Sequence, residues 1–375
     1  MLRTRARRGP TPSTRSESIT LALGIAGATA GLLVGLIALR GTAPLSGEGS
    51  IGQVAGVSAL VTSGLVGTGA LLVLTPRRHP WMRKIPWWRR ALAITGPALV
   101  YAVLAFLLTS AMFAVLQQAF LGVALDRFAG TFWVSVTTGI WAYVVGASAA
   151  ALNGRSLATL LMVFLTVGVL AAALLAPDPS WWQRFFSQLG ASSDRAGTTF
   201  NLTLALTGLA FVTVGDFLAH DLGRWARAAG EPWWKVQVVR GTLVVLGLLL
   251  VLVAVISLNV SEYWHNVAAE SLVVVFGLAL IVFPVLLHRL PGGLLVFTGL
   301  AFAILVMLIV LFEGVGYLNM TAFEMGAAAT VYVWLLLLIR AVSAAGEGTA
   351  EVEPEALSGG DVTPQDSGTA GTATE

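Results

Sequence analysis

Ten long apolar runs, separated by short polar segments, make up most of the chain. Each run is apolar on all sides rather than along one stripe, so it has no polar face to present to water. A helix needs roughly 20 residues to cross a bilayer, and each run is long enough to do so. The pattern therefore predicts an all-α, polytopic integral membrane bundle of about ten transmembrane helices. The runs are 19–39, 51–74, 91–117, 131–152, 156–176, 198–219, 238–258, 267–288, 292–312 and 320–340.

The amino-acid composition agrees with this pattern. Hydrophobic residues make up 57% of the 375 residues and charged residues only 11%, whereas a soluble domain carries about 25% charged residues. No cysteine is present, which excludes disulfides, thiolate metal sites and cysteine nucleophiles. The chain is rich in alanine and glycine, and nearly all its basic residues are arginine. This usage indicates a high-GC bacterium, and we expect an actinobacterial plasma-membrane protein.

The basic residues predict the orientation of the helices. Of the 22 lysines and arginines, 18 lie in the N-terminal segment, in or beside every second loop, or at the end of the last run. Cytoplasmic loops carry the excess of positive charge in membrane proteins. We therefore expect both termini to be cytoplasmic. The four basic residues on the predicted outer side are Arg40, Arg127, Arg184 and Arg195.

The runs and their flanking segments divide the chain into four parts. Residues 1–18 are basic and rich in serine, threonine and proline, and residues 341–375 are acidic; both compositions are typical of disorder. Between them we expect an N-terminal four-helix part over 19–152 and a C-terminal six-helix bundle over 156–340. The acidic tail either solubilises the chain or binds protein partners.

A stripe of glycines in the first run predicts a close helix pair. Gly27, Gly31 and Gly35 recur at intervals of four residues, which lets two helix backbones approach each other. The second run, 51–74, is rich in glycine, serine and threonine and has to pack on protein rather than lipid. We expect the second run to lie against this stripe.

The segment 76–90 mixes arginine with tryptophan. Nucleic-acid sites can share this composition, but the segment stands beside two membrane spans. Each basic residue near an anionic membrane surface contributes about 1 kcal/mol of attraction. We therefore expect membrane lipids, and no nucleic acid, as its partner. The sequence PWWRR at 86–90 and PWWK at 232–235 both lead into a run, which fits either an internal repeat or a shared interfacial design.

Polar residues at membrane depth are functional candidates because their burial is costly. One group lies at the predicted outer ends of the runs, and we predict that it forms a polar pocket at the outer leaflet. Within it, Asn266 and Glu270 are four residues apart and share a helix face. The alternative makes Asn201 an interhelical hydrogen-bond pin and His265 a solvated loop residue. The group comprises Ser187, Gly190, Asn201, His265, Asn266 and Glu270.

The loop that leads to this group, 177–197, has its own pattern. Trp182, Phe185, Phe186 and Leu189 fall at helical spacing, with polar residues between them. A short helix of this kind lies in the plane of the membrane surface. We therefore predict an interfacial helix in this loop.

A second polar group lies at the predicted inner ends of the runs. Asp216, His220, Asp221 and His288 are residue types that bind zinc, and Asp216 and His220 are four residues apart. The alternative is that they only meet water and headgroups, as helix-end residues usually do. We find no nucleotide-binding loop and no HExxH zinc motif, and we expect no cofactor. Ser187, Asp194 and His265 have no local sequence support as a catalytic triad, so an enzyme is not predicted.

The second half of the chain carries a family resemblance. The run Ser187-Gln188-Leu189-Gly190, then Phe200-Asn201 and Gly208, then His265 followed by Ala269, resembles the bacterial and archaeal family called domain of unknown function 998. The resemblance covers about 156–340 and leaves the first four runs outside. It implies a six-helix membrane unit without an established activity, distantly similar to eukaryotic proteins linked to GPI-anchor lipid remodelling and lipid distribution. The characteristic residues that it implies are Ser187, Gly190, Asn201 and His265.

Three functions fit these observations. The first is binding or handling of a lipid or lipid-linked molecule at the outer leaflet, for which the aromatic loop beside polar residues is the motive. The second is a transporter or permease component, which predicts a polar path to the middle of the membrane. The third is a non-catalytic scaffold that binds partners through the acidic tail and the basic segment 76–90.

Overall fold

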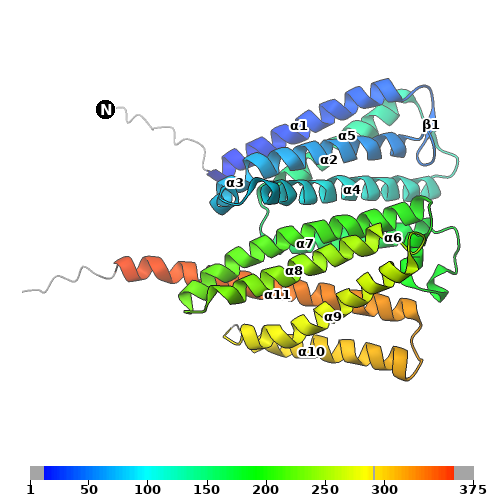
Figure 1. Cartoon of the computed structure of the whole chain (residues 1–375). Helices are drawn as coiled ribbons and strands as arrows, with labels where there is room; N and C mark the ends of the chain where they lie inside the picture. The colour runs from blue at the N-terminus through cyan, green and yellow to red at the C-terminus, as the bar shows by residue number, and fades with distance from the viewer. Residues whose placement is uncertain (1–11, 290–291, 359–375) are drawn as a thin grey trace, which may run out of the picture.

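A computed structural model describes residues 12–289 and 292–358. Within these ranges, ten helices are long and apolar enough to cross a membrane, which confirms the predicted all-α polytopic bundle (Figure 1). They are α1 (Pro12–Ala38), α2 (Ile51–Val73), α4 (Trp87–Ala119), α5 (Arg127–Ala150), α6 (Gly154–Leu175), α7 (Arg195–Ala228), α8 (Trp233–Val255), α9 (Glu262–Leu286), α10 (Gly292–Ile309) and α11 (Met320–Ser358).

Short elements occupy the loops. Two loops of the first half pair through the two-residue strands β1 (Ala43–Pro44) and β2 (Ala124–Leu125), which run antiparallel. A helical turn, α3 (Thr75–Arg78), and the 3-10 turn η1 (Pro80–Arg83) join α2 to α4. The loop after α6 contains η2 (Trp181–Gln183) and η3 (Phe186–Ala191), and α10 ends in a π-helical turn, η4 (Val310–Gly314).

The two ends of the bundle differ in what they carry. Helix α1 begins and α11 ends on the same side of the molecule, at the left in Figure 1, and we call this the terminal end. The α3–η1 segment and the α7–α8 connection lie there as well. The opposite side, with the β1–β2 pair and the α6–α7 loop, is the distal end. The arginine-rich segments 77–90 and 224–240 belong to the terminal end, so the prediction of cytoplasmic termini assigns this end to the cytoplasm.

The first and last helices are longer than the sequence pattern predicted. Helix α1 begins at Pro12 and α11 continues to Ser358, so helix replaces the predicted disorder over 12–18 and 341–358. Near the start of α1, Glu17 accepts a hydrogen bond of 2.9 Å from the Tyr143 hydroxyl of α5. The extension of α11 is rich in alanine and glutamate, which favour helix. The remainder of both predicted tails, 1–11 and 359–375, lies outside the described residues.

The glycine stripe of α1 packs on α5, not on α2 as predicted. A Cβ atom added at Gly27 would lie 2.4 Å from Cβ of Ala142, and one at Gly31 would lie 2.8 Å from Cβ of Thr138. The Ser135 hydroxyl of α5 also donates to the Ala28 carbonyl at 2.8 Å. Helix α5 offers small residues and threonines to the stripe, so the close approach that glycine permits is used there. Helix α2 packs instead on α4 and α5.

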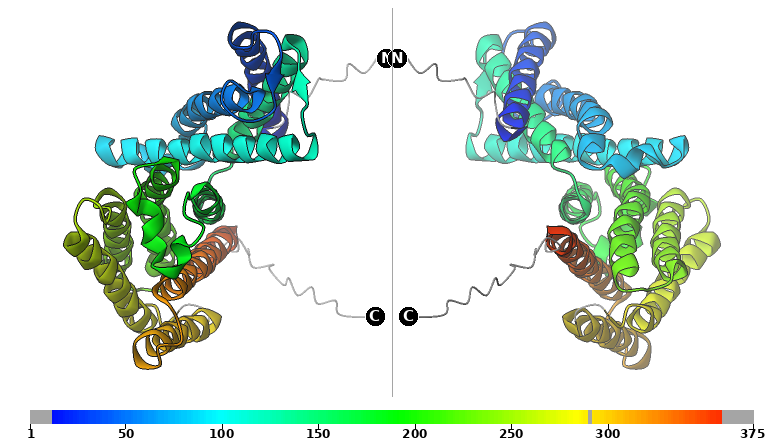
Figure 2. Two further views of the ribbon diagram at one scale, coloured as in Figure 1. Left: turned by 90° about the vertical axis from the view of Figure 1, so that its right-hand side faces the viewer. Right: turned by 90° about the vertical axis from the view of Figure 1, so that its left-hand side faces the viewer.

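Helix α7 is the central element of the second half. It has 34 residues. In its most apolar stretch, 78% of the residues are buried, a larger share than in any other span among the described residues. Helices α6, α8 and α11 pack on it, and α4 packs on it from the first half. Figure 2 shows the helices up to α5 as one group and those from α6 onwards as another, with α4 between them. Helix α4 therefore joins the two halves through α7.

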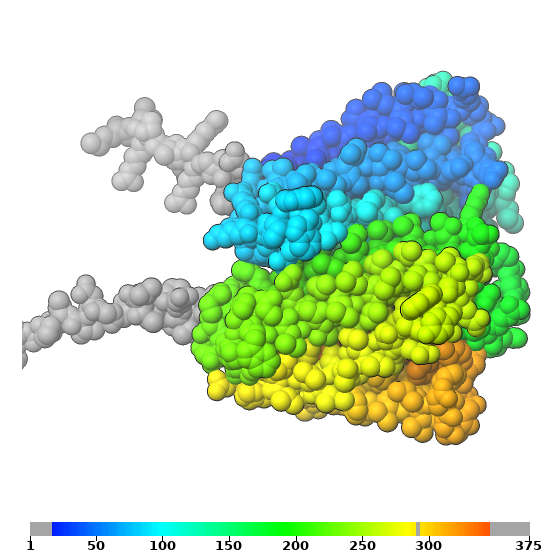
Figure 3. Space-filling model, viewed as in Figure 1, coloured from blue at the N-terminus to red at the C-terminus, as the bar shows by residue number. Residues whose placement is uncertain are grey.

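The peripheral helices carry apolar side chains on their surface. Helices α9 and α10 form the edge of the molecule farthest from α1 (Figures 1 and 3). Val285 of α9 is 72% exposed and Val296 of α10 is 75% exposed. Exposed apolar surface of this kind suits contact with lipid. The protein is therefore a multi-pass membrane protein.

Candidate functional sites

The distal α6–α7 loop folds onto the bundle instead of forming the predicted interfacial helix. Phe185 is extended, with φ of −149° and ψ of 156°, and this residue separates η2 from η3. Leu189 is only 2% exposed, and the Phe186 ring meets the Phe200 ring of α7 edge-on at 5.2 Å. The predicted apolar face was correct in part, but it packs on protein rather than on lipid. Only Trp182 of that face is strongly exposed.

Asn201 fastens this loop to α7. Its Nδ2 donates to the Gly190 carbonyl at 2.9 Å. A Cβ atom at residue 190 would lie 2.4 Å from Oδ1 of Asn201, so the contact requires glycine there. The alternative interpretation of Asn201 as a pin is therefore correct in kind, although the partner is a loop carbonyl and not a neighbouring helix.

Glu324, which lies outside the predicted site, completes this contact. Its carboxylate accepts from the Phe186 amide at 2.5 Å and from the Ser187 hydroxyl at 3.3 Å. Asn319, the residue just before α11, donates to the Trp182 carbonyl at 3.1 Å. The start of α11 thus holds the α6–α7 loop. The signal in the sequence was an acidic residue at the beginning of an apolar run, which calls for a partner.

We expect Glu324→Ala to loosen the α6–α7 loop without unfolding the bundle. The substitution leaves the Phe186 amide and the Ser187 hydroxyl without their acceptor, a loss of about 1–3 kcal/mol in local stability. Hydrogen exchange of the amides in 181–191 should therefore become roughly 5- to 100-fold faster. Glu313→Ala is the control, because Glu313 is exposed on the neighbouring turn. Equal exchange in the two variants would contradict the role of Glu324.

His265 is buried, contrary to its alternative interpretation as a solvated loop residue. It is 4% exposed, and its Nδ1 donates to the Ile256 carbonyl at 2.8 Å. Ile256 is the C-terminal cap of α8, so the imidazole satisfies a carbonyl that the end of a helix leaves free. Ser261 caps the start of α9 by accepting from the Trp264 amide. His265 therefore fixes the α8–α9 turn.

The six residues of the predicted outer pocket do not form one hydrogen-bonded group. Ser187, Gly190 and Asn201 lie together around the α6–α7 loop. The α9 set, His265, Asn266 and Glu270, is joined to the first by no hydrogen bond among the described residues. Asn266 and Glu270 are exposed and share the predicted helix face, but this face is turned to the surface.

A small cavity opens in the α6–α7 loop. It has a volume of about 70 Å³ and its polar lining is formed by Asp178, Gln188 and Ser192, with Trp181 as a further wall. One water needs about 10–15 Å³ on this measure, so the cavity admits a small polar group. In the same loop, the Ser192 hydroxyl and the Gly197 amide donate to the carboxylate of Asp194 and hold its pKa below the usual value. Ser192 thus belongs both to the cavity lining and to the N-terminal cap of α7.

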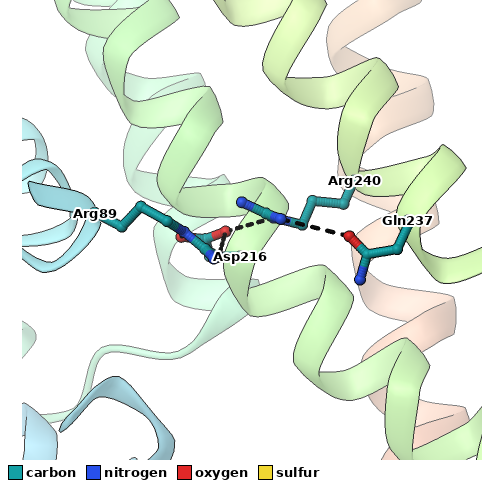
Figure 4. Close-up of polar contacts among 4 residues, drawn as sticks. All are labelled: Arg89, Asp216, Gln237 and Arg240. Carbon is teal, nitrogen blue, oxygen red and sulfur yellow. Dashed lines mark hydrogen bonds and ion pairs between the residues drawn. The ribbon is translucent and has the colours of Figure 1, made fainter. Parts of the chain in front are cut away.

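At the terminal end, the Asp216 carboxylate accepts from arginines of two other helices (Figure 4). Arg89 in the first turn of α4 donates through Nη2 to Oδ1 at 2.5 Å and through Nε to Oδ2 at 3.3 Å. Arg240 of α8 donates through Nε to Oδ1 at 2.8 Å, and its Nη1 lies 3.5 Å from Oε1 of Gln237. The Asp216 side chain is 3% exposed, against 19% for Arg89 and 23% for Arg240. These charges tie α4 and α8 to α7.

The structure does not assemble the predicted zinc site. Asp216 is occupied by its arginines, and the His220 ring stacks on the Trp81 ring at 4.9 Å. Asp221 accepts from Ser343 at 2.9 Å and from Arg224 at 3.3 Å. His288 is exposed at the end of α9. No cluster of three or more potential metal ligands occurs in the described part of the chain. Asp216, His220 and Asp221 instead meet basic, aromatic or hydroxyl partners.

The basic 76–90 segment is partly buried in the protein. Met82 is fully buried, the Trp81 ring meets Phe217 edge-on at 5.2 Å, and His79 Nε2 lies 2.9 Å from the Leu152 carbonyl. In contrast, Trp87 and Trp88 at the start of α4 are 81% and 51% exposed. The exposed tryptophans and the exposed basic residues Arg77, Arg78, Arg83 and Lys84 remain available for the lipid contact that the composition predicts.

A second ion-pair group holds the α7–α8 connection. Glu231 is paired with Lys235 at 2.6 Å and with Arg289 at 3.3 Å. The hydrogen bond from Lys235 lowers the pKa of the Glu231 carboxyl, and the nearby charge of Arg289 acts in the same direction. Arg289 also donates to the Ala229 carbonyl at 2.8 Å, so the group binds the end of α9 to the α7–α8 turn.

No family model, no curated protein and no solved structure matches this chain. The resemblance of 156–340 to the domain of unknown function 998 family therefore stays a prediction.

Proposed function

We propose that this chain binds a lipid or lipid-linked molecule at its distal end, in a bacterial plasma membrane with both termini in the cytoplasm. The observation that carries the proposal is the cavity of about 70 Å³ in the α6–α7 loop. Its polar lining lies at the start of a membrane span, which is the depth of lipid head groups.

The surface below the cavity suits an acyl chain. Ala176 and Pro177 line the cavity at the end of α6. On α6 itself, Leu170 and Leu174 are 57% and 86% exposed, and residues four apart share one helix face. An apolar strip therefore runs from the cavity into the membrane region. A water-soluble ligand has no apolar part that would contact this strip, whereas a lipid tail would lie along it.

The lining also selects a type of head group. Asp178 contributes a carboxylate, and Gln188 and Ser192 contribute neutral polar groups, while none of the lining residues is basic. A phosphate placed directly in the cavity would be repelled by Asp178. Hydroxyl and amino groups, in contrast, donate hydrogen bonds to these oxygens. The favoured ligand is a lipid that presents hydroxyl or amino groups at its head.

Mass spectrometry of lipids that co-purify with the protein tests this proposal. Gln188→Ala removes hydrogen-bonding groups from the lining, and Trp181→Ala removes a wall. We expect each to lower the amount of the retained lipid roughly 2- to 10-fold, the effect of about one hydrogen bond. Trp182→Ala is the matched control, because Trp182 is 50% exposed and does not line the cavity. If both lining variants retain the lipid of the parent protein in equal amount, the proposal fails.

A further inference from the structure

At the opposite, terminal end, Arg89 and Arg240 meet Asp216. Two guanidinium groups share one carboxylate, so the cluster keeps a net positive charge. All three side chains are largely shielded from solvent, with Asp216 only 3% exposed. An excess charge in such surroundings is stabilised by an anion.

Each arginine has N–H groups left over for that anion. A guanidinium carries several donors in a fixed fork. Arg89 uses Nε and Nη2 on Asp216, and Arg240 uses Nε on Asp216 and directs Nη1 towards Gln237. In the described part of the chain, no protein acceptor is found for Nη1 of Arg89 or Nη2 of Arg240. Neither nitrogen is completely buried, so each keeps some surface that a ligand can contact.

The depth of the cluster matches the phosphate layer of a membrane. Helix α7 starts at the distal end with Arg195, and about 20 residues cross the hydrocarbon core, which therefore ends near residue 215. Asp216 comes immediately after that point. Four tryptophans surround this level at the starts of α4 and α8, and indole rings favour the head-group region. They are Trp87, Trp88, Trp233 and Trp234, all more than half exposed.

We propose that Arg89 and Arg240, arranged around Asp216, bind the phosphate group of an anionic membrane lipid at the terminal end. Arginine forks match phosphate oxygens in geometry and charge. Basic sites between transmembrane helices bind anionic head groups in this way. The site is independent of the distal cavity: its ligand is anionic, whereas the distal lining favours donors of hydrogen bonds.

The test measures binding of phosphatidylglycerol to the purified full-length protein by native mass spectrometry, with phosphatidylcholine as the uncharged comparison. We expect Arg89→Gln and Arg240→Gln each to weaken phosphatidylglycerol binding about 5- to 20-fold and to leave phosphatidylcholine binding unchanged. Arg83→Gln removes the same charge from an exposed position of the same segment, and we expect less than about a twofold change there. Unchanged binding in both cluster variants, or an equal loss in Arg83→Gln, overturns the proposal.

Asp216→Asn separates a binding site from a purely structural cluster. The substitution keeps the shape of the side chain but removes the competing carboxylate charge. A binding site then gains affinity for phosphatidylglycerol, by about threefold or more, whereas a structural cluster gains none. Binding is measured below the unfolding temperature of Asp216→Asn. If this variant is unfolded at the temperature of the binding measurement, the loss of binding in Arg240→Gln alone tests the proposed site.

A competition experiment distinguishes the source of the phosphate. If millimolar inorganic phosphate displaces phosphatidylglycerol from the wild-type protein, the cluster takes free phosphate and the lipid assignment is overturned. If phosphatidylglycerol stays bound, the lipid assignment is supported, because the tail and the surrounding tryptophans add affinity that free phosphate lacks.

Discussion

Replacing Asp216 with alanine should lower the unfolding free energy by about 3–5 kcal/mol, because it leaves two partly buried arginines without their carboxylate. Arg89 and Arg240 belong to different helices, and α4 is a helix of the first half that packs on α7 of the second. The substitution therefore removes an attraction from the α4–α7 and α7–α8 contacts at once and replaces it with repulsion between the two guanidinium groups.

Equilibrium unfolding in mixed detergent, followed by tryptophan fluorescence, measures this loss. Glu262→Ala is the control, because Glu262 is an exposed acidic residue at the start of α9 and its loss should change stability by less than about 0.5 kcal/mol. A double-mutant cycle of Asp216→Asn and Arg240→Gln adds a second check: the pair should show a coupling energy of about 1–3 kcal/mol. A variant Asp216→Ala as stable as Glu262→Ala would show that the cluster does not hold the halves together.

The sequence predicted the helices well because run length alone decides them. An apolar segment of this length has no other stable form in a bilayer, since every backbone group must be satisfied within the segment. The choice of helix neighbours is a different matter. Gly27 and Gly31 indicate that some backbone comes close, but any helix with small residues could supply it. The sequence predicted the second run as the neighbour of this stripe, but in the structure α5 packs there, with Thr138 and Ala142 in contact with the glycines.

The sequence indicates which polar residues of the candidate sites matter, but it does not indicate which side chains they contact. Asp216 was recognised as a charge near membrane depth, but its partner Arg89 is 127 residues away and was assigned to the surface by its neighbouring tryptophans. His220 shared the helix face that a metal would need, yet an aromatic ring from the α3–η1 segment covers it. Spacing along one helix is local information, whereas the groups that satisfy a buried charge come from other helices.

The same limit applies to the distal end. Asn201 and Ser187 were identified by their polarity, and the structure gives each a structural partner, the Gly190 carbonyl and Glu324. His265 likewise has the Ile256 carbonyl. What the sequence did not indicate is the cavity, because it depends on the fold of the α6–α7 loop into two short turns. The candidate lining residues Asp178 and Gln188 are ordinary loop residues in the sequence.

Gly208→Ala should lower the unfolding free energy by about 1–3 kcal/mol, although alanine favours helix over glycine. A Cβ atom at residue 208 of α7 would lie 2.5 Å from the carbonyl oxygen of Gly247 in α8 and 2.9 Å from Cγ2 of Val251. The contact is reciprocal, since a Cβ atom at Gly247 would lie 2.5 Å from the Gly208 carbonyl oxygen. The two backbones touch, so neither helix can yield by moving a flexible side chain.

Gly241→Ala on α8 provides the matched control for this crossing. A Cβ atom there meets nothing within 4 Å, so the helix propensity of alanine acts alone and stability should stay equal or rise by up to about 1 kcal/mol. Gly247→Ala should resemble Gly208→Ala, and the double variant should lose less than the sum of the two, because helices already forced apart accept the second methyl group more easily. Equal stability of Gly208→Ala and Gly241→Ala would mean that α7 and α8 are held at this distance by other contacts, and that the close approach of the two glycines is incidental to the α7–α8 pairing.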